Sequence, residues 1–239
     1  MVTRDAVWPA GTPCWVDLGT DDEATALSFY GGLFGWTGGL LNGRRVAGIG
    51  PVAAHRPAGW TTYLAVADAD AAAAGVTAAG GRVLAGPVDL PGAARAAIAA
   101  DPAGAVFGVW QARAHTGGQL ANEPSALVWN EQHSADLEGS KRFYATVFGH
   151  TFDDTVDETG TRPYAMLKVE NQIAGGLGLL AGDGPPGWRT YFEVADADAA
   201  CHRVGELGGR VLRRPVDSPY GRLAQVTDDQ GAMFLVVQG

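Results

Sequence analysis

Carboxylate and imidazole side chains stand among tryptophans and tyrosines in segments that alternate like β-strands. His133 follows Glu131 by two residues, and strand residues two apart project from one face of a sheet. A carboxylate beside an imidazole can take up or deliver a proton. A buried carboxylate beside an indole ring would have a raised pKa, which suits acid or base catalysis. Asp17, Glu131 and His133 are therefore the candidate catalytic residues.

Aromatic side chains on the same segments are suited to holding a planar small molecule. Aromatic walls with a few fixed polar groups are typical of pockets for such ligands. The candidate ligand-binding residues are Trp15, Thr61, Tyr63, Trp110, Trp129, Arg189, Tyr191 and Glu193. Packing of the same rings in an ordinary core between sheet and helices explains them equally well.

Arg189 is the cation of this set. A guanidinium binds a carboxylate, a phenolate or another anionic group well, which favours an anionic ligand. A salt bridge to Glu193 or Glu131 is an alternative role for the same side chain.

The segments that carry these residues occur twice in the chain. The matching pairs are FY at 29–30 and 143–144, WTTY at 60–63 with WRTY at 188–191, and GGRVL at 80–84 and 208–212. Ordered self-similarity of this kind indicates a tandem repeat. It predicts a first module over 1–113, a linker rich in Gly, Asn and Pro over 114–125, and a second module over 126–239.

Each repeat shows the same order of predicted elements. In the first repeat we expect a strand at 14–18, a helix at 23–33, a strand at 61–66, a helix at 69–79 and two closing strands that end at Gln111. Asp22 and Asp136 stand where helix N-caps are expected, and Gly35 stands where the first helix should stop.

The two repeats differ in the region after their first helix. The offset between matching residues grows from 114 at the FY pair to 128 at the WTTY strand. The second module therefore carries an extra stretch near 153–164, and the second-strand region of the first module is truncated. The position of His133 is also not shared, because Gly19 stands there in the first module. A solvated loop histidine is thus the simpler interpretation of His133.

Charge and hydropathy exclude several classes of protein. There are 26 acidic and 17 basic residues, for a net charge of −9, which gives no electrostatic footprint for nucleic acid or an anionic membrane. The first ten residues lack the apolar region of a signal peptide, and no apolar run approaches about 18 residues. These features predict a soluble, cytoplasmic protein whose partner is a small molecule and which is a monomer or a homodimer.

Three motifs together resemble the vicinal oxygen chelate superfamily of glyoxalases, bleomycin-resistance proteins and extradiol dioxygenases. They are GTPCWVDL at 11–18, FYGGLFGW at 29–36 and DPAGA at 101–105. The WNE at 129–131 is similar to the two-module actinobacterial glyoxalase-like branch. The resemblance implies an α+β fold in which two tandem βαβββ modules pair into a curled mixed-sheet cup.

The resemblance also implies where a metal would bind. Metal-dependent members place His or Glu at three strand positions of a module. In this chain those positions map to Trp15, Thr61 and Gly108 in the first module, and to Trp129, Arg189 and Leu235 in the second. None offers a carboxylate or an imidazole, so we expect no cofactor. The alternative is a divalent metal displaced by two residues onto Asp17, Glu131 and Glu193, which suits a hard cation.

Three functions remain open at this point. The favoured one is a metal-independent protein that binds an aromatic or anionic natural product in a Trp-lined cup. The alternative is an enzyme of the same superfamily, of lyase, isomerase or oxygenase type, that uses Asp17 and Glu131 or a displaced metal site. A regulatory or structural module, with a cup filled by its own tryptophans, is the third. The sequence leaves open whether the protein is an enzyme.

Overall fold

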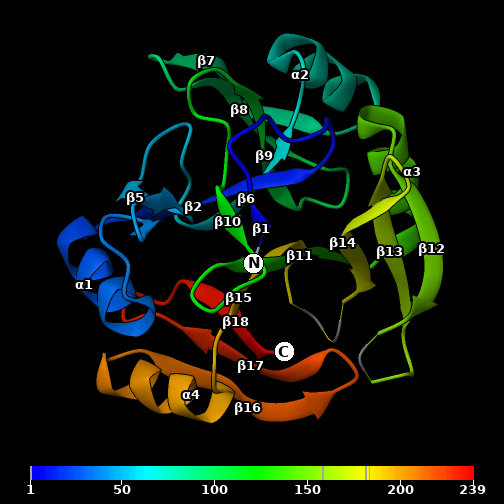
Figure 1. The fold of residues 1–239 in the computed structure, drawn as a ribbon. Helices are drawn as coiled ribbons and strands as arrows, with labels where there is room; N and C mark the ends of the chain where they lie inside the picture. Colours follow the sequence, from blue (N-terminus) through cyan, green and yellow to red (C-terminus); the bar gives the residue numbers. More distant parts are fainter. Residues whose placement is uncertain (1, 158, 181, 183) are drawn as a thin grey trace.

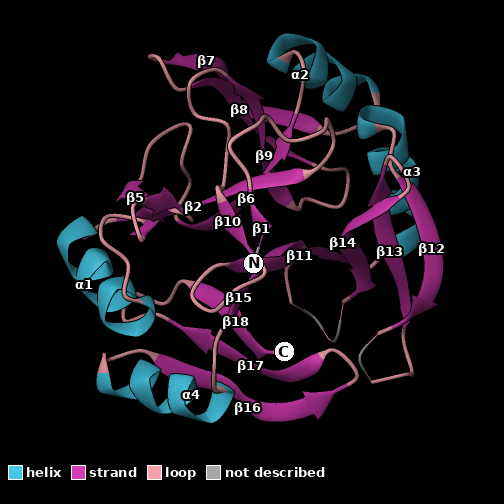
Figure 2. Ribbon diagram, viewed as in Figure 1, coloured by secondary structure: helices cyan, strands magenta, loops and turns pink. Residues whose placement is uncertain are grey.

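The fold repeats one arrangement of strands and helices in the two halves of the chain (Figures 1 and 2). The computed structural model describes residues 2–157, 159–180, 182 and 184–239. The first half contains β1 (Val2–Thr3), β2 (Pro13–Thr20), α1 (Glu23–Phe34), β3 (Leu40–Leu41), β4 (Arg44–Arg45), β5 (Gly48–Pro51), β6 (Gly59–Ala65), α2 (Ala69–Ala78), β7 (Arg82–Leu90), β8 (Ala94–Ala100) and β9 (Val106–Ala112). The second half contains β10 (Leu120–Ala121), β11 (Leu127–Ser134), α3 (Leu137–Phe148), β12 (Thr151–Val156), β13 (Pro163–Val169), β14 (Gln172–Leu179), β15 (Gly187–Glu193), α4 (Ala197–Glu206), β16 (Arg210–Ser218), β17 (Gly221–Thr227) and β18 (Met233–Gln238).

Curled mixed sheets form both halves, which confirms the predicted α+β class. The first sheet has the strand order β5-β2-β6-β9-β8-β7, and the second has β12-β13-β14-β11-β15-β18-β17-β16. At the centre of each sheet the first strands of two β-α units pair antiparallel, β2 with β6 and β11 with β15. Each repeat thus contains two β-α units and has its own concave face. We call these faces the first cup and the second cup.

The helix boundaries follow the capping residues that the sequence indicates. The Asp22 side chain accepts a hydrogen bond from the backbone N–H of Thr25, and Asp136 does the same for Gly139. An N-cap carboxylate satisfies a donor that the first helical turn leaves free. Gly35 ends α1 with a φ of 73°, in the left-handed region that glycine adopts readily.

Each repeat contains one strand that was not predicted from the sequence. Three strands follow the second helix of each repeat instead of two, because β7 and β16 precede the closing pair. Both are edge strands, and β7 alternates between exposed and half-buried residues. The Gly86-Pro87 dipeptide inside β7 is typical of a turn, which concealed the strand. The predicted linker also contains a short strand, β10, which pairs with β1 and β11.

The hydrophobic cores join the two halves. Helix α1 of the first half packs on the second sheet, where the Tyr30 ring lies 5.6 Å from Phe234 and in one cluster with Phe192. Helix α3 of the second half packs on the first sheet, with the Tyr144 ring 5.8 Å from Phe107. The repeat boundary in the sequence therefore does not divide the cores. None of the described helices is long and apolar enough to cross a membrane.

Candidate functional site

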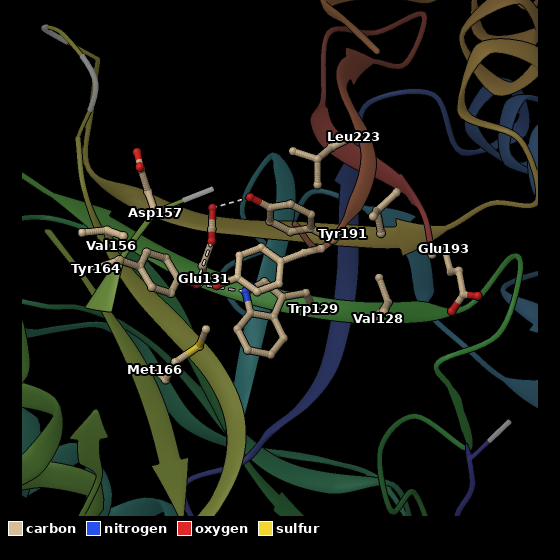
Figure 3. A pocket seen from close by; sticks show the side chains of 13 residues that line it. Val128, Trp129, Glu131, Val156, Asp157, Tyr164, Met166, Tyr191, Glu193 and Leu223 are labelled. Carbon is tan, nitrogen blue, oxygen red and sulfur yellow. Dashed lines mark hydrogen bonds between the residues drawn. The ribbon is translucent and has the colours of Figure 1, made fainter. Parts of the chain in front are cut away.

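A cavity of about 220 Å³ lies in the second cup, on the concave side of the second sheet (Figure 3). Its wall includes Trp129 and Glu131 of β11, Tyr191 and Glu193 of β15, Tyr164 and Met166 of β13, Leu223 of β17 and Val237 of β18. Strand alternation explains this set, because residues 129 and 131, and likewise 191 and 193, share one face of the sheet. The lining is mainly apolar and aromatic, with carboxylates among the rings.

Glu131 lies at the centre of a hydrogen-bonded cluster in this cavity (Figure 3). Its side chain accepts hydrogen bonds from the hydroxyls of Tyr191 and Tyr164, the latter at 2.9 Å. The Nε2 atom of His133 lies 2.6 Å from Oε1 of Glu131. Trp129 donates from its indole N–H to the Tyr164 hydroxyl at 3.1 Å. The Glu131 side chain, which is 8% exposed, therefore has several hydrogen-bonding partners around its carboxylate.

These contacts set the charge of Glu131. Burial disfavours the carboxylate, but the hydrogen bond and charge of His133 and the hydroxyls of Tyr191 and Tyr164 outweigh it, so the pKa of Glu131 is lowered. Burial and the neighbouring carboxylate raise the pKa of Tyr191 well above its ordinary value. At neutral pH the cup therefore contains an ionised Glu131 carboxylate that accepts a hydrogen bond from the neutral hydroxyl of Tyr191.

Two glycines of β14 make room for this cluster. A Cβ atom on Gly176 would collide with the Tyr164 hydroxyl oxygen, and one on Gly178 would lie 2.8 Å from the His133 ring. Gly176 is paired with Glu131 in the strand register. The absence of a side chain at Gly176 lets the Tyr164 hydroxyl reach Glu131.

Part of the cavity wall was missed by the reasoning from sequence. Val156 and Asp157 at the end of β12, and Tyr164 and Met166 on β13, line the cavity. Val156, Asp157 and Tyr164 lie within the extra stretch that the sequence predicts for the second module. The growing offset between the repeats was thus the signal that could have found them. Tyr220, in the turn between β16 and β17, lines the cavity as well.

The first cup holds the equivalent residues, but its own side chains fill it. Trp15, Tyr63 and Trp110 are buried and pack together. The His115 ring comes from the segment after β9 and lies 4.4 Å from Trp15 and 5.0 Å from Trp110. Thr61 is buried opposite Asp17 in the pairing of β2 and β6.

Asp17 has a different environment from its counterpart Glu131. Nε of Arg56 lies 3.2 Å from Asp17, and the Tyr63 hydroxyl donates to Asp17 at the same distance. Burial raises the pKa of Asp17 to about 6, although Arg56 and Tyr63 oppose the shift. The two cups therefore share a carboxylate and a tyrosine and differ in the basic side chain beside the carboxylate, which is Arg56 in the first cup and His133 in the second.

The two basic candidates of the second module lie in different places. Arg189 and Glu131 are opposite each other in the pairing of β15 and β11, yet Arg189 is not among the described residues that line the cavity. The basic side chain that contacts Glu131 is His133. The interpretation of His133 as a solvated loop residue is wrong, because it belongs to β11 and its side chain is mostly buried.

The residues present do not fit the divalent metal that the resemblance implies. The three mapped positions of the second module hold Trp129, Arg189 and Leu235, none of which ligates a metal ion with a lone pair at neutral pH. Within the described ranges, no group of three or more His, Cys, Asp or Glu side chains could hold a metal ion. Figure 3 shows Glu131 and Glu193 on opposite sides of the Trp129 and Tyr191 rings.

Comparisons with known proteins agree with this fold. Residues 131–236 match the family model described as the Glyoxalase/Bleomycin resistance protein/Dioxygenase superfamily. The Mycobacterium tuberculosis protein named "Putative glyoxylase CFP32" is 38% identical, over 95% of this chain and 95% of its own length. The Streptomyces peucetius "Anthracycline biosynthesis protein DnrV" is 35% identical, over 95% and 93%.

Solved structures of low sequence identity share the fold. The Mn(II)-bound glyoxalase from Novosphingobium aromaticivorans aligns with a TM-score of 0.66 at 17% identity, and the alignment covers 96% of this chain and 82% of that one. The substrate complex of homoprotocatechuate 2,3-dioxygenase from Brevibacterium fuscum gives 0.63 at 18%, with 98% and 82% covered. With relatives above 30% identity along nearly its whole length, this chain belongs to the Glyoxalase/Bleomycin resistance protein/Dioxygenase superfamily.

Proposed function

We propose that this protein binds an aromatic small molecule in the second cup, without a bound metal ion. The observation that carries the proposal is the cavity whose walls include the rings of Trp129, Tyr164 and Tyr191 around the buried carboxylate of Glu131. Aromatic rings hold a planar ligand by stacking and by excluding water, and a fixed hydrogen-bonding group orients it. No step in such binding requires a metal.

The names of two relatives support an aromatic ligand. DnrV and the related DauV of Streptomyces sp. (strain C5) are both named anthracycline biosynthesis proteins, and anthracyclines are polycyclic aromatic compounds. The cavity of about 220 Å³ is smaller than the roughly 300 Å³ at the low end of ligand pockets. A polycyclic ligand would therefore extend past the rim. The anionic ligand expected from sequence has less support, since Arg189 is outside the described lining of the cavity.

Calorimetric titration with naphthalenes that carry a hydroxymethyl, an aminomethyl or a carboxylate group tests this function. We expect saturable binding of at least one of them in buffer with EDTA, and unchanged affinity when Mg²⁺ or Mn²⁺ replaces EDTA. In Leu223→Trp an indole would fill the cavity, so affinity should fall at least about tenfold. The control is Leu212→Trp on β16, where the side chain is exposed.

Two results would overturn the proposal. One is the absence of saturable binding by all three naphthalenes. The other is equal binding by wild type and Leu223→Trp, which would place the ligand elsewhere. A strict need for stoichiometric metal would overturn its metal-free part.

Proton-transfer catalysis in the same cup is the second candidate function. The observation that favours it is the contact of Glu131 with His133 and two tyrosines, because a carboxylate ionised at neutral pH can accept a proton from a bound ligand. Glu131→Gln separates the two functions. Catalysis predicts that turnover of a ligand is lost in this variant while binding remains, whereas a binding protein shows no turnover in either form.

A further inference from the structure

The charged side chains that line the cavity are all acidic. The side-chain carboxylates in the described lining are those of Glu131, Asp157 and Glu193. The lining residues that the structure describes include no Lys, Arg or His. Carboxylates set in a partly dry, aromatic wall attract cations more strongly than they would in water, because the local dielectric constant is lower.

Two of these three carboxylates already have donors. Glu131 accepts hydrogen bonds from two tyrosines and contacts His133. Asp157 caps the turn that follows β12, where its Oδ1 accepts from the backbone N–H and the hydroxyl of Thr159. Its pKa is lowered by these turn contacts, which outweigh its slight burial. Neither group needs a ligand to satisfy it.

Glu193 differs from both. Its backbone is fixed, since its N–H donates to the carbonyl of Ala126 at 2.9 Å and its carbonyl accepts from Ser125 at 2.8 Å. Its side chain is half-buried, and it makes no hydrogen bond or ion pair with the part of the chain that the structure describes. Figure 3 shows it beyond Val128, at the end of the cavity away from Glu131.

We infer that the ligand of the second cup is an aromatic molecule with a protonated amine, and that Glu193 binds the ammonium group. This inference rests on the proposed function. The aromatic part lies against Trp129 and Tyr191, whose ring faces also attract a cation. The amine extends toward Glu193, where an ion pair forms at a position partly shielded from water. Glu193 is a binding residue and takes no part in proton transfer.

The same three naphthalenes test the inference, because their one substituent is neutral, cationic or anionic at neutral pH. We expect the aminomethyl compound to bind about tenfold more tightly than the hydroxymethyl compound, the size of a charge-assisted hydrogen bond. The carboxylate should bind most weakly. Added salt should reduce the preference for the amine, since it screens the ion pair.

Two variants with the same change in net charge locate the effect. Glu193→Gln should abolish the preference for the aminomethyl compound over the hydroxymethyl compound. Glu23→Gln, in the first turn of α1, should retain the preference. Equal binding of the amine and the alcohol by wild type overturns the inference alone, as does a preference that survives in Glu193→Gln. If none of the three compounds binds, the proposed function fails, and the inference with it.

Discussion

Asp17 and Glu131 occupy equivalent strand positions, yet their pKa values shift in opposite directions. Burial dominates at Asp17 and raises its pKa to about 6. At Glu131 burial is outweighed by His133 and the tyrosine hydroxyls. Because hydrogen bonds to the charged form favour ionisation, the number and strength of donors decide the charge. The same residue pattern thus gives two carboxylates of different acidity.

Removing one donor should make Glu131 less acidic. In Tyr191→Phe, Glu131 loses the hydroxyl that contacts Oε1, so its pKa should rise. The folded state should lose about 1–3 kcal/mol, the usual cost of a buried polar group deprived of its partner. NMR titration of the ¹³C-labelled Glu131 carboxyl group and urea unfolding measure both effects. Tyr220→Phe, at an exposed turn position, is the control. An unchanged Glu131 pKa would contradict the role of Tyr191.

Asp17 should make stability depend on pH in a defined window. Its pKa is about 6 in the folded state and 3.8 ordinarily, so the folded protein binds this proton more tightly. The stability that Asp17 contributes is therefore fully present below about pH 4 and is lost as the pH rises through about 6. The free energy of unfolding of wild type minus that of Asp17→Asn should fall by up to about 3 kcal/mol across this window. A constant difference between the two urea-unfolding curves from about pH 4 to 7 would contradict this.

At the scale of the element, strand periodicity predicts which residues share a face. It placed Glu131 and His133 of one strand on the same face as Tyr191 and Glu193 of another. In the structure Glu131, Tyr191 and Glu193 line one cavity, and His133 contacts Glu131. Asp22 and Gly35 likewise indicated both ends of α1. Such signals are local, because capping and alternation depend on neighbours in the chain.

Which cup is hollow could not be predicted from the same patterns. His115 fills the first cup from a segment far from Trp15 in the chain, and no periodicity encodes that contact. The approach of Tyr164 to Glu131 depends on the register between β13 and β14 and on the absence of a side chain at Gly176. Both contacts join residues that are far apart in the chain, so local sequence patterns do not predict them.

Gly176 should therefore be intolerant of even one methyl group. In Gly176→Ala the Cβ would collide with the Tyr164 hydroxyl, so Tyr164 must move and its hydrogen bond to Glu131 is lost. We expect a loss of about 1–3 kcal/mol in the free energy of unfolding. Gly205→Ala in α4, where nothing lies within 4 Å of the new Cβ, is the matched control. It should stabilise by about 0.5–1 kcal/mol, since alanine favours a helix. Equal changes in the free energy of unfolding for Gly176→Ala and Gly205→Ala, measured by urea unfolding, would contradict the close approach of the Tyr164 hydroxyl to Gly176.

At the scale of the whole molecule, each half needs the other to bury its helices. Tyr30 of α1 packs against Phe234 of β18, so the core of the second sheet contains a helix of the first half. We expect one cooperative unfolding transition in calorimetry, in wild type and in Phe234→Ala alike. The variant should lose about 3–5 kcal/mol, as large-to-small changes in cores do. Two separate transitions would show that the halves unfold independently.

The superfamily fold is retained here while the mapped metal positions carry other side chains. Trp129 and Arg189 stand where metal-dependent relatives are expected to hold ligands, and the wall of the second cup is aromatic instead. A fold constrains where a site lies more than what the site does. In this chain the concave face of the second cup therefore carries an aromatic side chain at the mapped position of Trp129 and further aromatic rings around it.

Methionine methyl groups give the most direct test of the second cup as the ligand site. The chain has three methionines; Met166 lines the cavity, whereas Met233, at the start of β18, is outside the described lining. In ¹³C-methyl spectra assigned with Met166→Leu, an aromatic ligand should shift the Met166 signal through its ring current more than the Met233 signal, because Met166 lines the cavity while Met233 only packs against lining residues such as Leu223. A saturable shift of Met166, absent in Leu223→Trp, is the result we predict. Binding that moves Met233 and leaves Met166 in place would contradict the assignment of the site to the second cup.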